Sequence, residues 1–451
     1  MAEPSTTAAR RYLPWLVAGA GFAFDLAAFW PGQMSFDSAS AWWQARGGAG
    51  NDIVPPGFTL AWRIGQWVAD GPCTLFVFHL ALFWSGIALL ARAWLRSRAA
   101  IFAFMLLAGF APLPLLLRGH VWTDVGLFAA LTFACGLLAG AHGAARVRLG
   151  LALLALLYAN AMRHNALPAI VPLAAWWAAL ASSGVAPARG PRLRVALVTL
   201  AVLGLAVGSN RWLAARAGPH VPLWPLAAEY DLAALSIAGS HMLLPDFMIG
   251  DGLEVDELAS TFRDWSALPM LTGTRHGLRA PIEPPPLSAD ERARLLRAWI
   301  GAIAAQPWDW LAHRWRVTRA LLGTHAPDWP VELVYVDAEY AFRDNPPVAP
   351  NGGALHATLM RWARAHVATA WLAAWPYLAL GVLAAPLAWM RRRHAGAQVA
   401  LILLASAWLY LLPLCLFAAS AEVRYVAWSC VASLLAFAGV AFALLDSAKT
   451  P

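Results

Sequence analysis

Ionisable residues that could carry chemistry lie in a few short stretches of the sequence, each beside a long apolar segment. Asp37 stands in the stretch Trp30–Ser38, directly after the first apolar segment, and Asp52 follows in the same connection. Carboxylates can act as general bases or bind metal ions, whereas arginine and histidine are suited to binding phosphate. Because such residues are costly to bury among apolar helices, they indicate a functional site. The other candidates are Arg118, His120, Asp124, Arg163, His164, Glu422 and Arg424.

The three carboxylates of this set that lie in the first half of the chain also have structural interpretations. Asp37 could cap a helix that starts near Ser38, and Asp124 could cap the helix that follows it. Asp52 follows Asn51 and could simply shape a turn. We favour Asp37 as the catalytic residue, with Asp124 and Asp52 as further catalytic candidates.

The basic candidates are harder to explain by structure alone. Arg163 and His164 could extend their polar ends from an apolar layer into water, and Arg424 could pair with Glu422. Positive charge at these positions, however, opposes the distribution that sets the orientation of membrane proteins. We therefore expect these residues to bind substrate.

The composition assigns the chain to the integral membrane proteins. Among its 451 residues, 60% are hydrophobic and only 13% are charged. In ordinary soluble domains the charged fraction is about a quarter. A membrane helix needs about 20 mostly apolar residues, and the sequence offers about ten such stretches. They are Tyr12–Trp30, Pro72–Trp94, Ala99–Leu117, Val125–His142, Leu149–Met162, Leu167–Ser182, Val195–Trp212, Val367–Met390, Val399–Ala418 and Val426–Leu445.

Arginine clusters predict the orientation, because the cytoplasmic connections of membrane proteins carry an excess of Lys and Arg. With the N-terminus inside, every cluster falls on the cytoplasmic side, and both termini lie there. The net charge of +8 is thus mostly explained by topology and does not indicate nucleic-acid binding. The clusters are Arg10 and Arg11, Arg92, Arg96 and Arg98, Arg146 and Arg148, Arg189, Arg192 and Arg194, and Arg391, Arg392 and Arg393, with Lys449 near the end.

Two outer connections are long. Pro31–Gly71 includes the amphipathic stretch Phe58–Val68, which could lie along the surface. Ala214–Ala365 is long enough for a small domain, and its patterns are helical. Ser288 begins a capping-box sequence, and Pro307 is placed to open a second helix that Gly323 can close. We therefore predict three parts: residues 1–213, 214–365 and 366–451.

The sequence contains no P-loop, GxSxG, HExxH or dinucleotide-binding motif. The four cysteines lack metal-ligand spacing and are best interpreted as small apolar residues. The chemistry of common soluble enzymes therefore finds no support.

Several short motifs together resemble the GT-C superfamily of membrane glycosyltransferases, which includes protein O-mannosyltransferases and the lipid A aminoarabinose transferase. They are the Pro-Gly-x(4)-Asp-Ser setting of Asp37, the Asp-x-x-Pro-Pro that begins at Asp52, the Trp-x-Asp that ends at Asp124, the Arg-x-Asn that begins at Arg163, and the Arg-Tyr that begins at Arg424. The layout is also similar, with seven helices followed by a variable remainder.

The resemblance implies an all-α fold and a sugar donor built on a polyprenyl phosphate. Asp37 would deprotonate or orient the acceptor hydroxyl, while Arg163, His164 and Arg424, with Arg118, His120 and Glu422, would bind substrate. The acceptor would be a glycan, lipid or protein, and the active face would be periplasmic on the bacterial inner membrane. Relatives often have His where this chain has Val54, and no acidic residue adjoins Asp37. These departures make metal ligation the less favoured role of Asp37, although the sequence leaves open whether the protein needs a divalent cation.

Two other classes compete with the enzyme. A transporter or flippase for a lipid-linked or amphipathic substrate would also place polar residues in a helical bundle, but would favour repeat symmetry and charges at mid-membrane. A structural subunit would tolerate neutralisation of the outer charges. The one-sided distribution of the candidates favours the enzyme.

Overall fold

The fold is helical, as predicted. The computed structural model describes residues 4–141, 146–183, 190–283, 285–324, 334 and 341–447. Within these residues the regular elements are helices, and β-structure is limited to isolated bridges such as that between Gln33 and His120. Arg189 and Lys449, which helped to orient the chain, lie outside the described residues.

Among the described residues, five helices are long and apolar enough to cross a membrane, and one bent pair could add a sixth. These helices indicate a membrane protein; the larger number of about ten stays a prediction. The five are Arg11–Phe29 within α1 (Pro4–Phe29), α4 (Cys73–Trp94), α10 (Pro191–Ala217), α18 (Ala395–Phe417) and Val423–Leu444, which joins the short turn η3 (Val423–Val426) to α19 (Ala427–Ser447). Shorter helices beside them are α7 (Thr123–Ala139), α8 (Arg146–Met162), α9 (Leu167–Ser182) and α17 (Trp375–Met390).

Two predicted spans differ in the structure. The stretch Ala99–Leu117 is not one straight helix but α5 (Arg98–Phe110) and α6 (Pro112–Arg118), bent by 59°. Pro112 begins α6, and a proline cannot donate the backbone hydrogen bond that would continue α5. Likewise, the helix predicted from Val367 begins only at Trp375, with a proline at its first turn.

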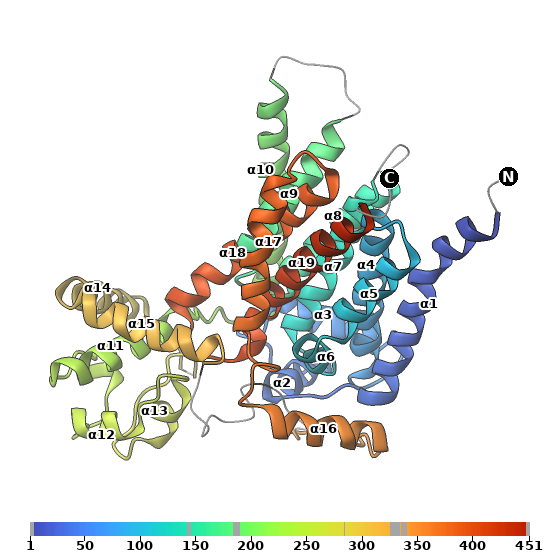
Figure 1. The fold of residues 1–451 in the computed structure, drawn as a ribbon. Helices are drawn as coiled ribbons and strands as arrows, with labels where there is room; N and C mark the ends of the chain where they lie inside the picture. Colours follow the sequence, from blue (N-terminus) through green and yellow to red (C-terminus); the bar gives the residue numbers. More distant parts are fainter. Residues whose placement is uncertain are drawn as a thin grey trace.

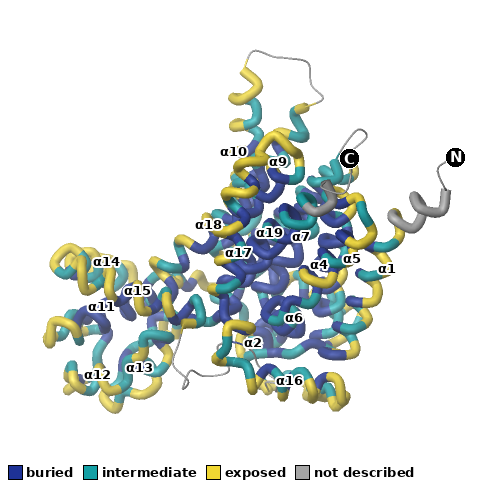
Figure 2. Tube along the Cα trace, viewed as in Figure 1, coloured by how far each residue is buried: buried dark blue, intermediate teal, exposed yellow. Residues whose placement is uncertain are grey.

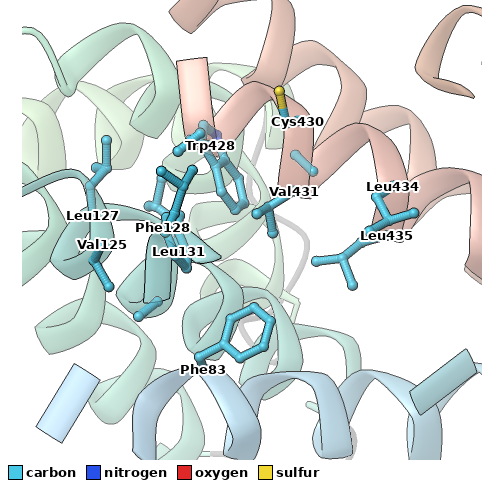
Figure 3. Close-up of a cluster of buried hydrophobic side chains, with 14 of the residues drawn as sticks. Phe83, Val125, Leu127, Phe128, Leu131, Trp428, Cys430, Val431, Leu434 and Leu435 are labelled. Atoms are coloured by element: carbon cyan, nitrogen blue, oxygen red, sulfur yellow. The ribbon is translucent and has the colours of Figure 1, made fainter. Parts of the chain in front are cut away.

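The core of the bundle lies where α7 and α19 pass between the other helices (Figure 1, Figure 2). Figure 3 shows Phe83 of α4, Phe128 of α7 and Trp428 of α19 in one buried cluster. Gly86 and Gly136 allow α4 and α7 to approach closely, since a Cβ on Gly86 would lie 2.6 Å from the backbone of α7. Helices from the predicted first and last parts therefore share one core.

The predicted region 214–365 divides into separate pieces. Its larger piece has its own apolar core, formed by α11 (Trp224–Gly239), η1 (Asp246–Met248), α12 (Val255–Thr261), α13 (Leu268–Gly273), α14 (Ala289–Ala305) and α15 (Pro307–Leu321). By contrast, α16 (Ala354–His366) packs against the end of α1, where His356 bonds the carbonyl of Ala28 at 2.8 Å. Figure 1 shows α16 apart from α11–α15.

The helix signals inside this larger piece are confirmed. Ser288 and Glu291 form the capping box at the start of α14, and Pro307 is the first residue of α15. Gly323 follows with a φ of 81°, a conformation that favours glycine.

Candidate functional site

Asp37 lies in the first turn of α2 (Phe36–Ala45), directly after the chain leaves α1. The N-cap of α2 is Ser35, so the capping interpretation of Asp37 is wrong. Its carboxylate instead accepts a hydrogen bond of 2.5 Å from Arg424, which lies 387 residues away in sequence. The side chain of Asp37 is 52% exposed while that of Arg424 is 9% exposed. The arginine therefore holds a carboxylate that remains open to solvent.

Arg424 stands in η3, immediately before α19, and bridges two carboxylates. Its Nη2 donates to Asp37, and its Nε donates to Glu422 at 2.5 Å. The guanidinium also lies 4.9 Å from the ring centroid of Trp122. A planar guanidinium can satisfy two acceptors at once and stack on an aromatic ring, which fixes its orientation.

A second acid–base pair adjoins the first. Asp124, the second residue of α7, is buried and accepts hydrogen bonds of 2.6 Å from Nη1 of Arg163 on both oxygens. Because the N-cap of α7 is Trp122, the capping interpretation of Asp124 is also wrong. Arg163 lies 4.8 Å from the ring centroid of Tyr425, which also contacts Arg424 at 5.4 Å.

Separate connections of the chain thus supply one cluster of three carboxylates and two guanidiniums, which we call the outer cluster: Asp37, Asp124, Arg163, Glu422 and Arg424. If every member is ionised, the cluster has one negative charge in excess. Its carboxylates are 2% exposed at Asp124, 20% at Glu422 and 52% at Asp37. Asp37 is therefore the carboxylate that a substrate can reach most easily.

A cavity of about 500 Å³ adjoins this cluster through Arg163. Its walls come from α8, α9, α10 and α3 (Pro56–Gly65), and its polar lining includes Asn160, His164, Arg211 and His220. The Nε2 of His164 lies 3.2 Å from the carbonyl oxygen of Ile53. Basic side chains thus converge on a space large enough for a phosphate and part of its substituent.

Asp52 lies on the wall of this cavity rather than in the outer cluster. Its two carboxylate oxygens bond Nδ1 of His220 at 2.5 Å and the backbone N–H of Val221 at 2.7 Å. The local turn is shaped by Asn51, whose side chain accepts from the backbone of Ile53. Asp52 therefore anchors the segment that follows α10, and its predicted catalytic role has no support from contact with the outer cluster.

Two further candidates are buried. Arg118 is 0% exposed and pairs with Asp25 of α1 at 3.0 Å, so we leave it out of the proposed site. His120 stacks on Trp122 with ring centroids 3.9 Å apart. Trp122 in turn lies against Arg424, so His120 can position that arginine through the ring of Trp122. Direct substrate contact is unsupported for both buried side chains.

Several residues that support the outer cluster or line the cavity were not predicted as site residues from the sequence. Tyr425 and Trp122 support the arginines through their rings, and a Tyr after Arg424 was the only signal available for the first. Arg211 lies in the last two turns of α10, and His220 lies just beyond its end. The signal that could have found them is basic residues on the predicted outer side of the membrane, where arginine is normally scarce.

The described residues contain no group of three or more His, Cys, Asp or Glu side chains arranged to hold a metal ion. Comparisons with protein-family models, with curated proteins and with solved structures give no match for this chain.

Proposed function

We propose that this chain is a GT-C-like glycosyltransferase of the bacterial inner membrane. It would move a sugar from a polyprenyl phosphate to a hydroxyl group of a glycan, lipid or protein at the periplasmic face. The observation that carries the proposal is the outer cluster, in which Arg424 holds the half-exposed carboxylate of Asp37 beside a basic cavity.

The division of labour follows from exposure and charge. Asp37 accepts the proton of the acceptor hydroxyl, whose oxygen attacks the anomeric carbon of the sugar. The bond between that carbon and the phosphate oxygen breaks, and the lipid phosphate leaves with the bonding electron pair. Arg163 and His164, which line the cavity, stabilise the negative charge that grows on the phosphate.

The helices around the cavity suit a lipid carrier. Val207 of α10 lines the cavity, while Leu200 and Leu205 on the same helix are 63% and 51% exposed. The prenyl chain would follow this apolar surface while its phosphate enters the cavity. The start of α1, the end of α9 and the start of α10 lie at the opposite end of the bundle from α2 and α16 (Figure 1), which supports the predicted orientation.

The test is product analysis with the full-length protein in lipid vesicles. A panel of polyprenyl-phosphate hexoses and pentoses is supplied with a membrane extract as the source of acceptors. The proposal predicts release of free polyprenyl phosphate and transfer of the sugar. It also predicts that Arg163→Gln slows the release, whereas Arg361→Gln, on the distant α16, does not.

The outcome that favours the competing class is equally clear. A flippase would leave every donor chemically intact while moving it to the other leaflet. Intact donors with altered leaflet distribution would reject the enzyme, as would transfer that is unchanged by Arg163→Gln.

A further inference from the structure

The hairpin of α14 and α15 presents an exposed apolar stripe. On α14, Leu296 and Ile300 are four residues apart and 40% and 59% exposed; on α15, Trp308, Leu311 and Trp315 are 78%, 45% and 62% exposed. Spacings of three, four and seven residues place side chains on one face of a helix. Large apolar side chains that are this exposed form a patch typical of a surface that binds a protein or a membrane.

The stripe is not needed for the packing of the hairpin itself. The opposite faces of these helices hold the buried residues Leu295, Ala302 and Val317. Two tryptophans, Trp299 and Trp310, donate hydrogen bonds of 2.8 and 2.9 Å to the buried Asp231 of α11. The buried face of the hairpin is therefore held against α11, and the apolar stripe lies on the face that is left exposed.

The stripe is continuous with an exposed surface of the candidate span α18. Thr318 of α15 bonds the carbonyl of Cys415 at 3.3 Å, and the ring of Trp299 contacts Phe417 edge-on at 6.3 Å. Phe417 is 50% exposed, and Leu412, five residues earlier in α18, is 62% exposed. On a membrane-spanning helix such side chains face lipid, so the lipid layer reaches the edge of the hairpin.

The arrangement in space agrees with this continuity. Figure 1 shows α14 and α15 on the side of their region nearer the level of the spans, with α12 and α13 on the other side. Arg297 of α14 and Arg319 of α15 are exposed beside the stripe. Tryptophan, leucine and isoleucine with neighbouring arginine are typical of helices that lie in the interface of a membrane with anionic lipids.

We propose that the α14–α15 hairpin docks onto the outer leaflet, with the stripe in the upper acyl region and Arg297 and Arg319 at anionic phospholipid headgroups. Docking would hold the region α11–α15 at a fixed height above the membrane. The inference rests on exposure and packing and is independent of the proposed transferase activity.

The experiment uses the full-length protein in nanodiscs that contain phosphatidylethanolamine and phosphatidylglycerol. Cys73→Ala and Cys415→Ala remove the two partly exposed thiols, while the buried Cys135 and Cys430 remain. A fluorescent maleimide is then attached through Ile300→Cys or Leu311→Cys. The matched control is Ala259→Cys, exposed on the water-facing α12.

Two readouts are compared for each position: the rate of reaction with the water-soluble maleimide, and quenching of the attached dye by phospholipids with a nitroxide near the top of the acyl chain. The proposal predicts slower labelling and about threefold stronger quenching through Ile300→Cys and Leu311→Cys than through Ala259→Cys. Equal labelling and equal quenching at all positions would overturn it. Slow labelling without lipid quenching would also overturn it, since a protein partner would then cover the stripe.

Discussion

Two ion pairs between an arginine and an aspartate occupy different depths of this molecule and differ in what they can do. The pair Asp25–Arg118 joins α1 to α6 with both side chains 0% exposed, while Asp37–Arg424 joins α2 to η3 with the carboxylate 52% exposed. In both, the guanidinium lies near an aromatic ring, Phe83 at 4.4 Å in the first and Trp122 at 4.9 Å in the second. The difference teaches that charge pairing alone does not indicate a functional site. Our proposal rests instead on the accessibility of a carboxylate that a buried guanidinium holds.

Other buried groups also bond the inner pair, although Nη1 of Arg118 is buried without a hydrogen-bond partner. Arg118 also donates to the carbonyl of Gly109, and the indole of Trp84 donates to Asp25 at 2.8 Å. These contacts connect α1, α4, α5 and α6 without leaving a surface for substrate. The inner pair therefore has a structural role, while the outer pair is the one to which we propose a chemical role.

The largest effect is expected from breaking the inner pair. Arg118→Leu leaves Asp25 as an unpaired buried carboxylate, and we expect it to lower the free energy of unfolding by about 3–5 kcal/mol. Unfolding of the purified protein in mixed detergent micelles measures the loss. Adding Asp25→Leu should restore most of the stability, because two apolar side chains replace the pair. A double variant as unstable as the single one would contradict the assignment.

Asp124→Asn tests the member of the outer cluster that most resembles the inner pair. It removes the charge that Arg163 pairs with while it preserves the side-chain volume. We expect a loss of stability of about 1–3 kcal/mol from the unsatisfied arginine, and a fall in transfer rate of about 100-fold from its misplacement. Sugar transfer at matched protein level measures the second effect. Lost stability with full activity would place Asp124 with the inner pair.

Arg424→Lys tests whether the outer pair depends on the shape of the guanidinium or only on its charge. A lysine keeps the positive charge but lacks the planar fork that serves Asp37 and Glu422 together. We expect about a tenfold decrease in transfer with little change in thermal stability. Arg361→Lys, on α16, provides the control. If Arg424→Lys transfers at the normal rate, the geometry of the bridge is unimportant.

Glu291 lies outside both the inner and the outer pair, and its carboxylate stabilises the start of α14. Hydrogen bonds from the backbone and side chain of Ser288, together with the ion pair to Arg279, lower its pKa from 4.5 to about 2. Since the pKa is depressed in the folded state, the stabilisation is present above pH 4.5 and is lost as the pH falls toward 2. Ser288→Ala should cost about 1 kcal/mol at the start of α14, measured by hydrogen exchange of its first turn. Asp290→Asn, which lies outside the capping box, is the control.

Much of the outer cluster could be predicted from the sequence, because the arginine clusters predict which connections lie on the same side of the membrane. In the predicted topology, Asp37, Asp124, Arg163 and Arg424 all stand in outer connections between apolar segments, so one orientation places them on the same side. The pair of Arg424 with Glu422 was predicted and is confirmed. The pairs Asp37–Arg424 and Asp124–Arg163 could not be predicted, since they depend on the rotation of each helix. For the same reason Asp25 was not recognised as the partner of Arg118.

The divisions of the fold were harder to predict than the helices. Pro112 is evident in the sequence. Whether a proline bends a span or starts a new helix depends, however, on how the neighbouring helices pack around it. The packing of α16 against α1 relies on contacts such as that of His356 with Ala28, which are remote in sequence. Local patterns, by contrast, were sufficient for the capping box at Ser288.

The most direct test of the account is Asp37→Asn, with sugar transfer and thermal unfolding measured on the same preparation. Asparagine keeps the shape of Asp37 but cannot accept the acceptor's proton. We predict that transfer falls by at least about 100-fold while the unfolding temperature stays close to that of the original protein, because the side chain is half-exposed. Full transfer activity with the protein present at its normal level would contradict the central claim that the outer carboxylate performs the chemistry.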